Sequence, residues 1–157
     1  SYTDKCLGEF IRFLKSDSSR WEQSLVVLVP DHYGAYPRDL SDPLQRHRIP
    51  LVLTGGAVSH AAPMQITTPA SQSDIAATLL SLLGIGHSQF PLSHDMLQPG
   101  APQYAFFSEP DFAAMVTDNG LHAVISTQNG ETISGNDSIA QLTKAFLQNL
   151  YNDLDAR

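Results

Sequence analysis

The sequence predicts an α/β domain in which a mostly parallel sheet is flanked by helices and a small antiparallel meander follows. Two observations lead to this class. Residues 25–29 and 51–54 are short apolar runs without alternation, which is typical of strands covered on both faces. Helical patterns lie around them and at the C-terminus, and helices mixed with strands in this order indicate an α/β layer.

The first helix is expected over residues 3–16, with Thr3 as a suitable N-cap. Its apolar residues recur at the i, i+3, i+4, i+7 spacing of an amphipathic helix. The chain shows neither an initiator Met nor a secretory signal segment before this pattern. We therefore expect a piece of a longer polypeptide, with a processed N-terminus as the alternative. The apolar stripe consists of Leu7, Phe10, Ile11 and Leu14.

The two apolar runs are separated by a long polar segment. The first run, 25–29, stops at Pro30, and the second, 51–54, follows Pro50. Residues 31–48 between them are turn-rich and too numerous for a hairpin loop. Long loops that leave a buried strand often carry function, so this segment is where we expect a site.

The next helix has clear signals at both ends. Ser73 or Asp74 caps its start, and Gly84 ends it in the C′ position. We interpret Asp74 as a negative charge that is favourable at the helix N-terminus, and not as a metal ligand. The stripe expected to be buried consists of Ile75, Leu79 and Leu82.

The C-terminal third predicts a meander and a last helix. Asp118-Asn119-Gly120 is a strong hairpin signal, because Asn-Gly tolerates positive φ. The last helix is expected over about 138–154, with a stripe of apolar residues. We divide the chain into an α/β part at 1–97 and a hairpin-and-helix part at 98–157, within one domain or partial domain. The expected strands cover 104–108, 112–117, 121–126 and 131–133, and the stripe is Ile139, Leu142, Phe146 and Leu150.

Composition excludes several classes of function. Nine Lys and Arg residues stand against sixteen Asp and Glu, for a formal net charge of −7, without a basic cluster. This balance argues against nucleic-acid binding. No uncharged apolar run approaches the roughly 20 residues of a membrane span. A single cysteine, Cys6, excludes an internal disulfide framework.

Asp31 and His32 form the one pair with evident chemistry. They follow the 25–29 run, and ligands of open α/β sheets bind beyond the carboxyl ends of strands. A carboxylate and an imidazole suit Zn²⁺ or Mn²⁺, although a loop aspartate beside a surface histidine has the same pattern. His47 and His60 are the nearest further candidates, and His47 also fits a solvated basic turn. The other histidines are interpreted as structural or surface residues: His87, His94 and His122.

Three motifs in order resemble one known family. They are Tyr2-Thr3-Asp4-Lys5 and Gly8-Glu9-Phe10 leading to Pro30-Asp31-His32-Tyr33-Gly34; Arg48-Ile49-Pro50-Leu51-Val52-Leu53; and Ser71-Gln72-Ser73-Asp74-Ile75-Ala76-Ala77-Thr78-Leu79-Leu80 closed by Leu83-Gly84-Ile85. Together they are similar to the C-terminal part of the sulfatase and phosphoglycerol-transferase family, which includes the lipoteichoic acid synthases. The resemblance covers about residues 2–97 closely and the remainder loosely. It implies the C-terminal portion of an alkaline-phosphatase-like sandwich.

The resemblance also implies a site. Asp31 and His32 would ligate an active-site divalent metal ion, with Mn²⁺, Zn²⁺, Mg²⁺ and Ca²⁺ all open. Tyr33 and His47 are weaker candidates for a substrate loop. The family's nucleophile and other ligands lie upstream of the matching segment, so no catalytic residue is assigned in this chain. We expect the isolated chain to be catalytically inactive, and we expect a longer parent protein that contains it to act on a sulfate or phosphate ester.

The resemblance further places such a parent at the cell membrane, with its catalytic domain outside the cytoplasm and this fragment soluble. Two alternatives stay open. The chain could be a non-catalytic binding module that keeps the fold, with its aromatic residues as a contact surface, although the same residues fit a core. A small complete hydrolase is the third hypothesis, and no triad spacing supports it. The aromatic residues are Tyr104, Phe106, Phe107 and Phe112.

Overall fold

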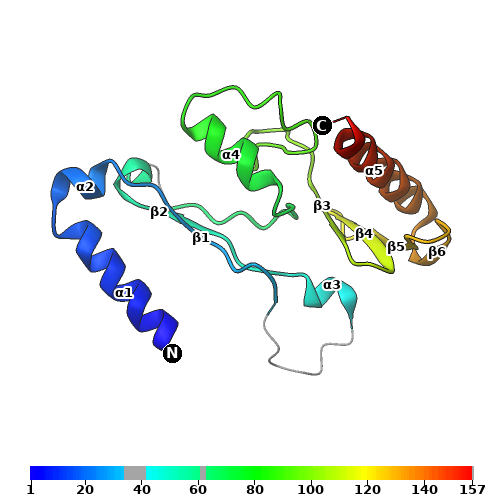
Figure 1. The fold of residues 1–157 in the computed structure, drawn as a ribbon, viewed down its shortest axis with the longest axis horizontal. Coiled ribbons are helices and arrows are strands. Elements are labelled where there is room, and N and C mark those ends of the chain that lie inside the picture. The colour runs from blue at the N-terminus through cyan, green and yellow to red at the C-terminus, as the bar shows by residue number, and fades with distance from the viewer. Residues whose placement is uncertain (34–41, 61–62, 157) are drawn as a thin grey trace. The chain divides into compact units, whose positions relative to one another are not determined.

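The computed structural model describes residues 1–33, 42–60 and 63–156. Its contacts divide the chain into two compact units, Ser1–Ile66 and Thr67–Arg157. Figure 1 labels the helices and strands of both units. The helix after Ser73 therefore groups with the C-terminal sheet, whereas the sequence analysis placed it with the N-terminal part.

The first unit begins with two helices that contact each other. Helix α1 (Tyr2–Lys15) is capped by the Ser1 hydroxyl, two residues before the expected Thr3, and helix α2 (Ser18–Glu22) follows it. The Arg20 guanidinium donates to the Phe13 carbonyl at 2.8 Å and lies 4.2 Å from the centre of the Phe13 ring. Arg20 of α2 therefore contacts both the backbone near the end of α1 and the exposed ring of Phe13.

The two strands of this unit correct one part of the prediction. Strand β1 (Val26–Leu28) pairs with β2 (Val52–Thr54) in antiparallel register, with Val27 opposite Leu53. The α/β class is confirmed, but the expected mostly parallel sheet is not: every strand pair among the described residues is antiparallel. The expected cover on both faces is not seen either: of these two strands only Val26 is buried, and Val52 is exposed. An unalternating apolar run carries no information on strand direction. The long segment between the strands leaves the chain room to reverse.

A glycine fixes the exit from β2. Gly55 has φ +120°, and a Cβ placed there would lie 2.2 Å from the Ser24 carbonyl oxygen. Only glycine fits so close to another backbone at this φ. Two short helices complete the described part of the unit, α3 (Pro43–Arg46), capped by Asp42, and the 3₁₀ helix η1 (Gly56–Val58).

The second unit is built on a four-stranded antiparallel sheet. The strand order is β3-β4-β5-β6, so neighbours in the chain are neighbours in the sheet. The β4–β5 turn contains Gly120 at φ +79°, which confirms the predicted hairpin. The four expected strands agree with those of the structure to within two residues at each end: β3 (Tyr104–Ser108), β4 (Phe112–Thr117), β5 (His122–Ser126) and β6 (Thr132–Gly135).

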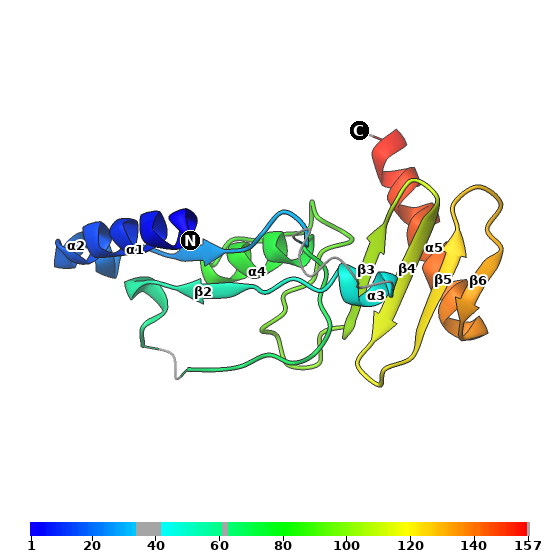
Figure 2. The ribbon, with the colours of Figure 1, turned by 90° about the horizontal axis from the view of Figure 1, so that it is seen from below.

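Helix α5 (Asp137–Asp155) covers one face of this sheet, as Figure 2 shows. Leu142, expected in its buried stripe, is exposed, and Thr143 is buried instead. Thr143 can be buried because its hydroxyl donates to the Ile139 carbonyl at 2.7 Å. The shared core consists of Ala113, Met115, Ala123, Ile125, Ile139, Ala140 and Leu147, with Tyr104, Phe106, Phe146 and Leu150 packed against it.

Helix α4 (Asp74–Leu82) confirms the predicted element but buries a different face. Leu82, expected in the buried stripe, is exposed. Apolar residues lie on most sides of this helix, so periodicity alone does not select the buried side. Its buried residues are Asp74, Ala77 and Thr78. Within the described ranges, none of the helices has the length and apolar character needed to span a membrane.

Candidate functional site

Asp31 and His32 follow β1, whose pairing ends at Leu28, with Val29 and Pro30 in between. Pro30 has no N–H to donate, so the ladder cannot continue through it and the chain leaves the strand. Both side chains are exposed, by 86% for Asp31 and 78% for His32. The predicted pair is therefore accessible to an ion from solvent.

The local hydrogen bonds orient the imidazole. The Asp31 Oδ1 atom accepts from the His32 backbone N–H at 3.0 Å. The His32 Nδ1 atom lies 2.7 Å from the Tyr33 carbonyl oxygen. Because a carbonyl only accepts, Nδ1 carries the proton and the lone pair of the neutral ring is at Nε2. A backbone carbonyl that accepts from the other ring nitrogen is a common partner of a metal-binding histidine.

The two free ligand atoms have the spacing that a divalent ion requires. His32 Nε2 and Asp31 Oδ2 are 3.5 Å apart. Bonds of about 2.1 Å at a tetrahedral ion place two ligand atoms about 3.4 Å apart. One ion could therefore bind both atoms without rearrangement of either side chain. Without an ion, the same exposed contact stabilises the fold little.

The pair does not form a complete site within the part of the chain that the structure describes. No group of three or more His, Cys, Asp and Glu side chains there could hold a metal ion. His47 and His60 thus do not complete a three-ligand cluster with Asp31 and His32. A catalytic ion normally takes three or more protein ligands.

His47 and Tyr33 have local roles in the structure. His47 follows α3 as its C-cap residue, and its Nδ1 lies 2.7 Å from the Pro43 carbonyl oxygen. Tyr33 contributes the carbonyl that orients His32. Most of the expected substrate loop, 34–41, lies outside the described residues.

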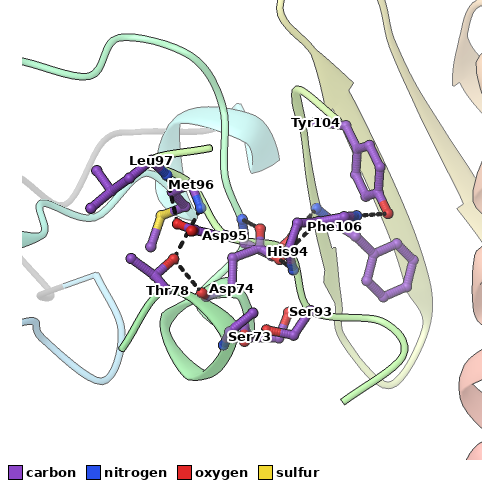
Figure 3. A network of polar contacts seen from close by, with 12 residues as sticks. Ser73, Asp74, Thr78, Ser93, His94, Asp95, Met96, Leu97, Tyr104 and Phe106 are labelled. Carbon is purple, nitrogen blue, oxygen red and sulfur yellow. Dashed lines mark hydrogen bonds and ion pairs between the residues drawn. The ribbon is translucent and has the colours of Figure 1, made fainter. Parts of the chain in front are cut away.

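A second Asp–His pair, which the sequence analysis missed, is buried in the second unit (Figure 3). The Asp74 carboxylate accepts from the Ser71 N–H at 2.7 Å, the His94 N–H at 2.9 Å and His94 Nδ1 at 2.8 Å. The other ring nitrogen, Nε2, is 2.8 Å from the Tyr104 hydroxyl. Ser71 and Asp74 have capping-box spacing, which could have indicated the first bond. His94 is twenty residues away and has no local signal.

The Tyr104 hydroxyl at the end of this network has a raised pKa. Burial, and secondarily the charge of Asp74, raises the pKa of Tyr104 to about 12. The phenol therefore keeps its proton at neutral pH and donates it in the hydrogen bond to His94 Nε2. A raised pKa does not favour Tyr104 as the nucleophile of a small hydrolase.

The aromatic residues proposed as a contact surface divide into two pairs. Tyr104 and Phe106 both pack against Phe146 of α5, with ring centres 5.8 and 4.3 Å away. These two rings belong to the core, as the alternative interpretation held. Phe107 and Phe112 pack edge to face on each other, 6.3 Å apart.

Comparison with known proteins identifies the class to which this fold and site belong. The family model described as Sulfatase matches residues 1–85, more than half of the chain, and the chain belongs to this family. Membership usually implies a metal cofactor. The matched segment contains Asp31, His32 and α4, whereas His94 and Tyr104 lie beyond it.

One curated relative matches more of the chain than the family model does. The lipoteichoic acid synthase-like protein YvgJ of Bacillus subtilis (strain 168) is 26% identical over 154 residues, covering 87% of this chain and 24% of the relative. The chain therefore spans about a quarter of that protein's length. No solved structure matches the chain.

Proposed function

We propose that Asp31 and His32 are two ligands of the active-site divalent metal ion of a sulfatase-family enzyme. The observation that carries this proposal is the 3.5 Å spacing of His32 Nε2 and Asp31 Oδ2 within the segment matched by the family. The Tyr33 carbonyl supports it, because this bond presents Nε2 and not Nδ1 to the ion. The exposure of both side chains leaves them open to further ligands.

The proposed reaction hydrolyses or transfers a sulfate or phosphate ester. A bound divalent ion supplies Lewis acidity, which lowers the pKa of a coordinated nucleophile and stabilises charge on the ester oxygens. Asp31 contributes negative charge and His32 a neutral donor, and neither needs to transfer a proton. Because two side chains do not complete such a site, we infer that the nucleophile and the other ligands come from elsewhere in a longer polypeptide.

The relative favours the phosphate-ester alternative. Its name, lipoteichoic acid synthase-like, relates it to the synthases that the sequence analysis groups with the phosphoglycerol transferases. By the same analogy we propose a membrane-anchored parent with the catalytic domain outside the cytoplasm. Tyr33 and His47 remain our proposed residues of the substrate loop.

The test uses the full-length protein that contains this chain, assayed with an aryl phosphate, an aryl sulfate and a phosphatidylglycerol vesicle in the presence of Mn²⁺. We expect Asp31→Ala and His32→Ala each to lower turnover at least about 100-fold, because each removes one ligand of the ion. The matched control His87→Ala, a histidine of the second unit, should retain wild-type activity. Retained turnover in either ligand variant would contradict the assignment, and the preferred ester distinguishes the two branches.

A further inference from the structure

Helix α4 makes several polar bonds to residues 93–97, which we call the strap. The residues that α4 buries are Asp74, Ala77 and Thr78, two of them polar, while Leu82 at its end is exposed. None of the buried residues of the hydrophobic core between the sheet and α5 comes from α4. Hydrogen bonds to the strap therefore contribute to fixing this helix, beside the burial of Ala77.

The strap binds along one face of α4, as Figure 3 shows. The Ser93 hydroxyl donates to the Ser73 carbonyl at 2.7 Å and accepts from the Ala77 N–H at 3.0 Å. One turn along, the Met96 N–H donates to the Thr78 hydroxyl at 3.0 Å. Residues 73, 74, 77 and 78 lie on the same helix face, so each bond reinforces the same docked position.

His94 extends this docking to the sheet. Its backbone N–H and Nδ1 both bond to Asp74, while Nε2 bonds to the Tyr104 hydroxyl on β3. The His94 and Tyr104 rings also pack edge to face with centres 4.9 Å apart. Tyr104 in turn packs on Phe146 of α5. One imidazole thus bridges the start of α4 and an aromatic residue that borders the core.

We propose that the strap is a latch: α4 and residues 86–103 open together as one local unit, and the bonds of His94 keep that unit closed. Loss of the imidazole takes one of three donors from the Asp74 carboxylate, which is only 3% exposed. A buried carboxylate that loses a donor is stabilised by exposure to water, so opening becomes more favourable. The core of β4, β5 and α5 contains none of these bonds and stays closed. Local units of this kind open independently of the global fold.

Hydrogen exchange of the full chain, followed by mass spectrometry, tests the latch. In His94→Ala we expect the amides of α4 and the strap to exchange at least about tenfold faster. Those of β4, β5 and α5 should change less than twofold. The control His87→Ala replaces a histidine of the same connecting segment that makes none of these bonds, and it should exchange like the wild type.

Tyr104→Phe is the milder second variant, because it removes only the hydroxyl at the far end of the chain of bonds. It should accelerate the same peptides by a smaller factor, about threefold, and keeps the test decisive if His94→Ala does not fold. Faster exchange confined to α4 and the strap supports the latch. Unchanged exchange in these peptides, or an equal increase in β4, β5 and α5, overturns it.

Discussion

The chain contains two Asp–His pairs, of which one is exposed to solvent and the other is largely buried. In the first unit, Asp31 and His32 are 86% and 78% exposed, and their facing atoms are 3.5 Å apart, too far for a strong hydrogen bond. In the second unit, Asp74 and His94 are 3% and 19% exposed and bonded at 2.8 Å. Both ring nitrogens of His94 are engaged, whereas His32 keeps Nε2 for a ligand. Exposure and the free nitrogen, and not the residue types, distinguish a candidate metal site from a structural link.

The largest expected difference between the two pairs is in stability. Asp74→Ala leaves three N–H donors, one buried and two part-buried, without their acceptor, and we expect it to lower the free energy of unfolding by about 3 kcal/mol. Asp31→Ala removes an exposed contact and should change it by less than about 0.5 kcal/mol. Urea unfolding followed by far-UV circular dichroism measures both. Equal losses of unfolding free energy in Asp74→Ala and Asp31→Ala would contradict the distinction between a structural pair and an exposed pair.

A smaller effect separates two buried threonines. The Thr78 hydroxyl accepts from the Met96 N–H of the strap, whereas the Thr143 hydroxyl only donates to a carbonyl of its own helix. Thr78→Val therefore leaves the part-buried Met96 N–H unpaired and should lower the free energy of unfolding by about 1–2 kcal/mol in urea. Thr143→Val leaves no such donor, so we expect less than about 0.7 kcal/mol. A larger loss for Thr143→Val would show that the strap bond contributes little.

The smallest effect is in alkaline solution. The pKa of Tyr104 is raised from 10.0 to about 12 in the folded state, so the unfolded chain loses this proton first. The contribution of Tyr104 is therefore complete below pH 10 and is lost as the pH rises from 10 to 12. Over this interval, thermal unfolding of Tyr104→Phe should depend less on pH than that of the wild type. Tyr151→Phe, which replaces an exposed tyrosine, should follow the wild-type curve, and identical curves for all three proteins would contradict the shift.

Local signals predicted the elements and the position of the exposed pair. The helix α1, the Asn119-Gly120 turn and the end of β1 each depend on neighbours within a few positions, and each was found where expected. The stripe of α1 was not buried as a whole, since Phe10 is exposed and Leu14 is buried. The antiparallel pairing of β1 with β2 depends on the course of a long loop, which no local pattern records.

The sequence also did not predict which side chains are buried by residues far away in the chain. Asp74 has the spacing of a helix cap, but its burial depends on His94, twenty residues later. Leu82 and Leu142 fit helical stripes by periodicity, yet both are exposed, because what lies opposite a helix face decides burial. Periodicity therefore predicted which residues form helices better than which side of each helix is covered.

The most direct measurement of the central claim is the broadening by Mn²⁺ of the imidazole NMR signals of the six histidines in this chain. A bound paramagnetic ion broadens the nearest nuclei most. We predict that the His32 signals broaden first, that Asp31→Ala shifts this broadening to at least about tenfold higher Mn²⁺ concentration, and that the His94 signals persist. Broadening of His94 before His32, or a His32 response that Asp31→Ala leaves unchanged, would contradict the assignment of the exposed pair as the metal ligands.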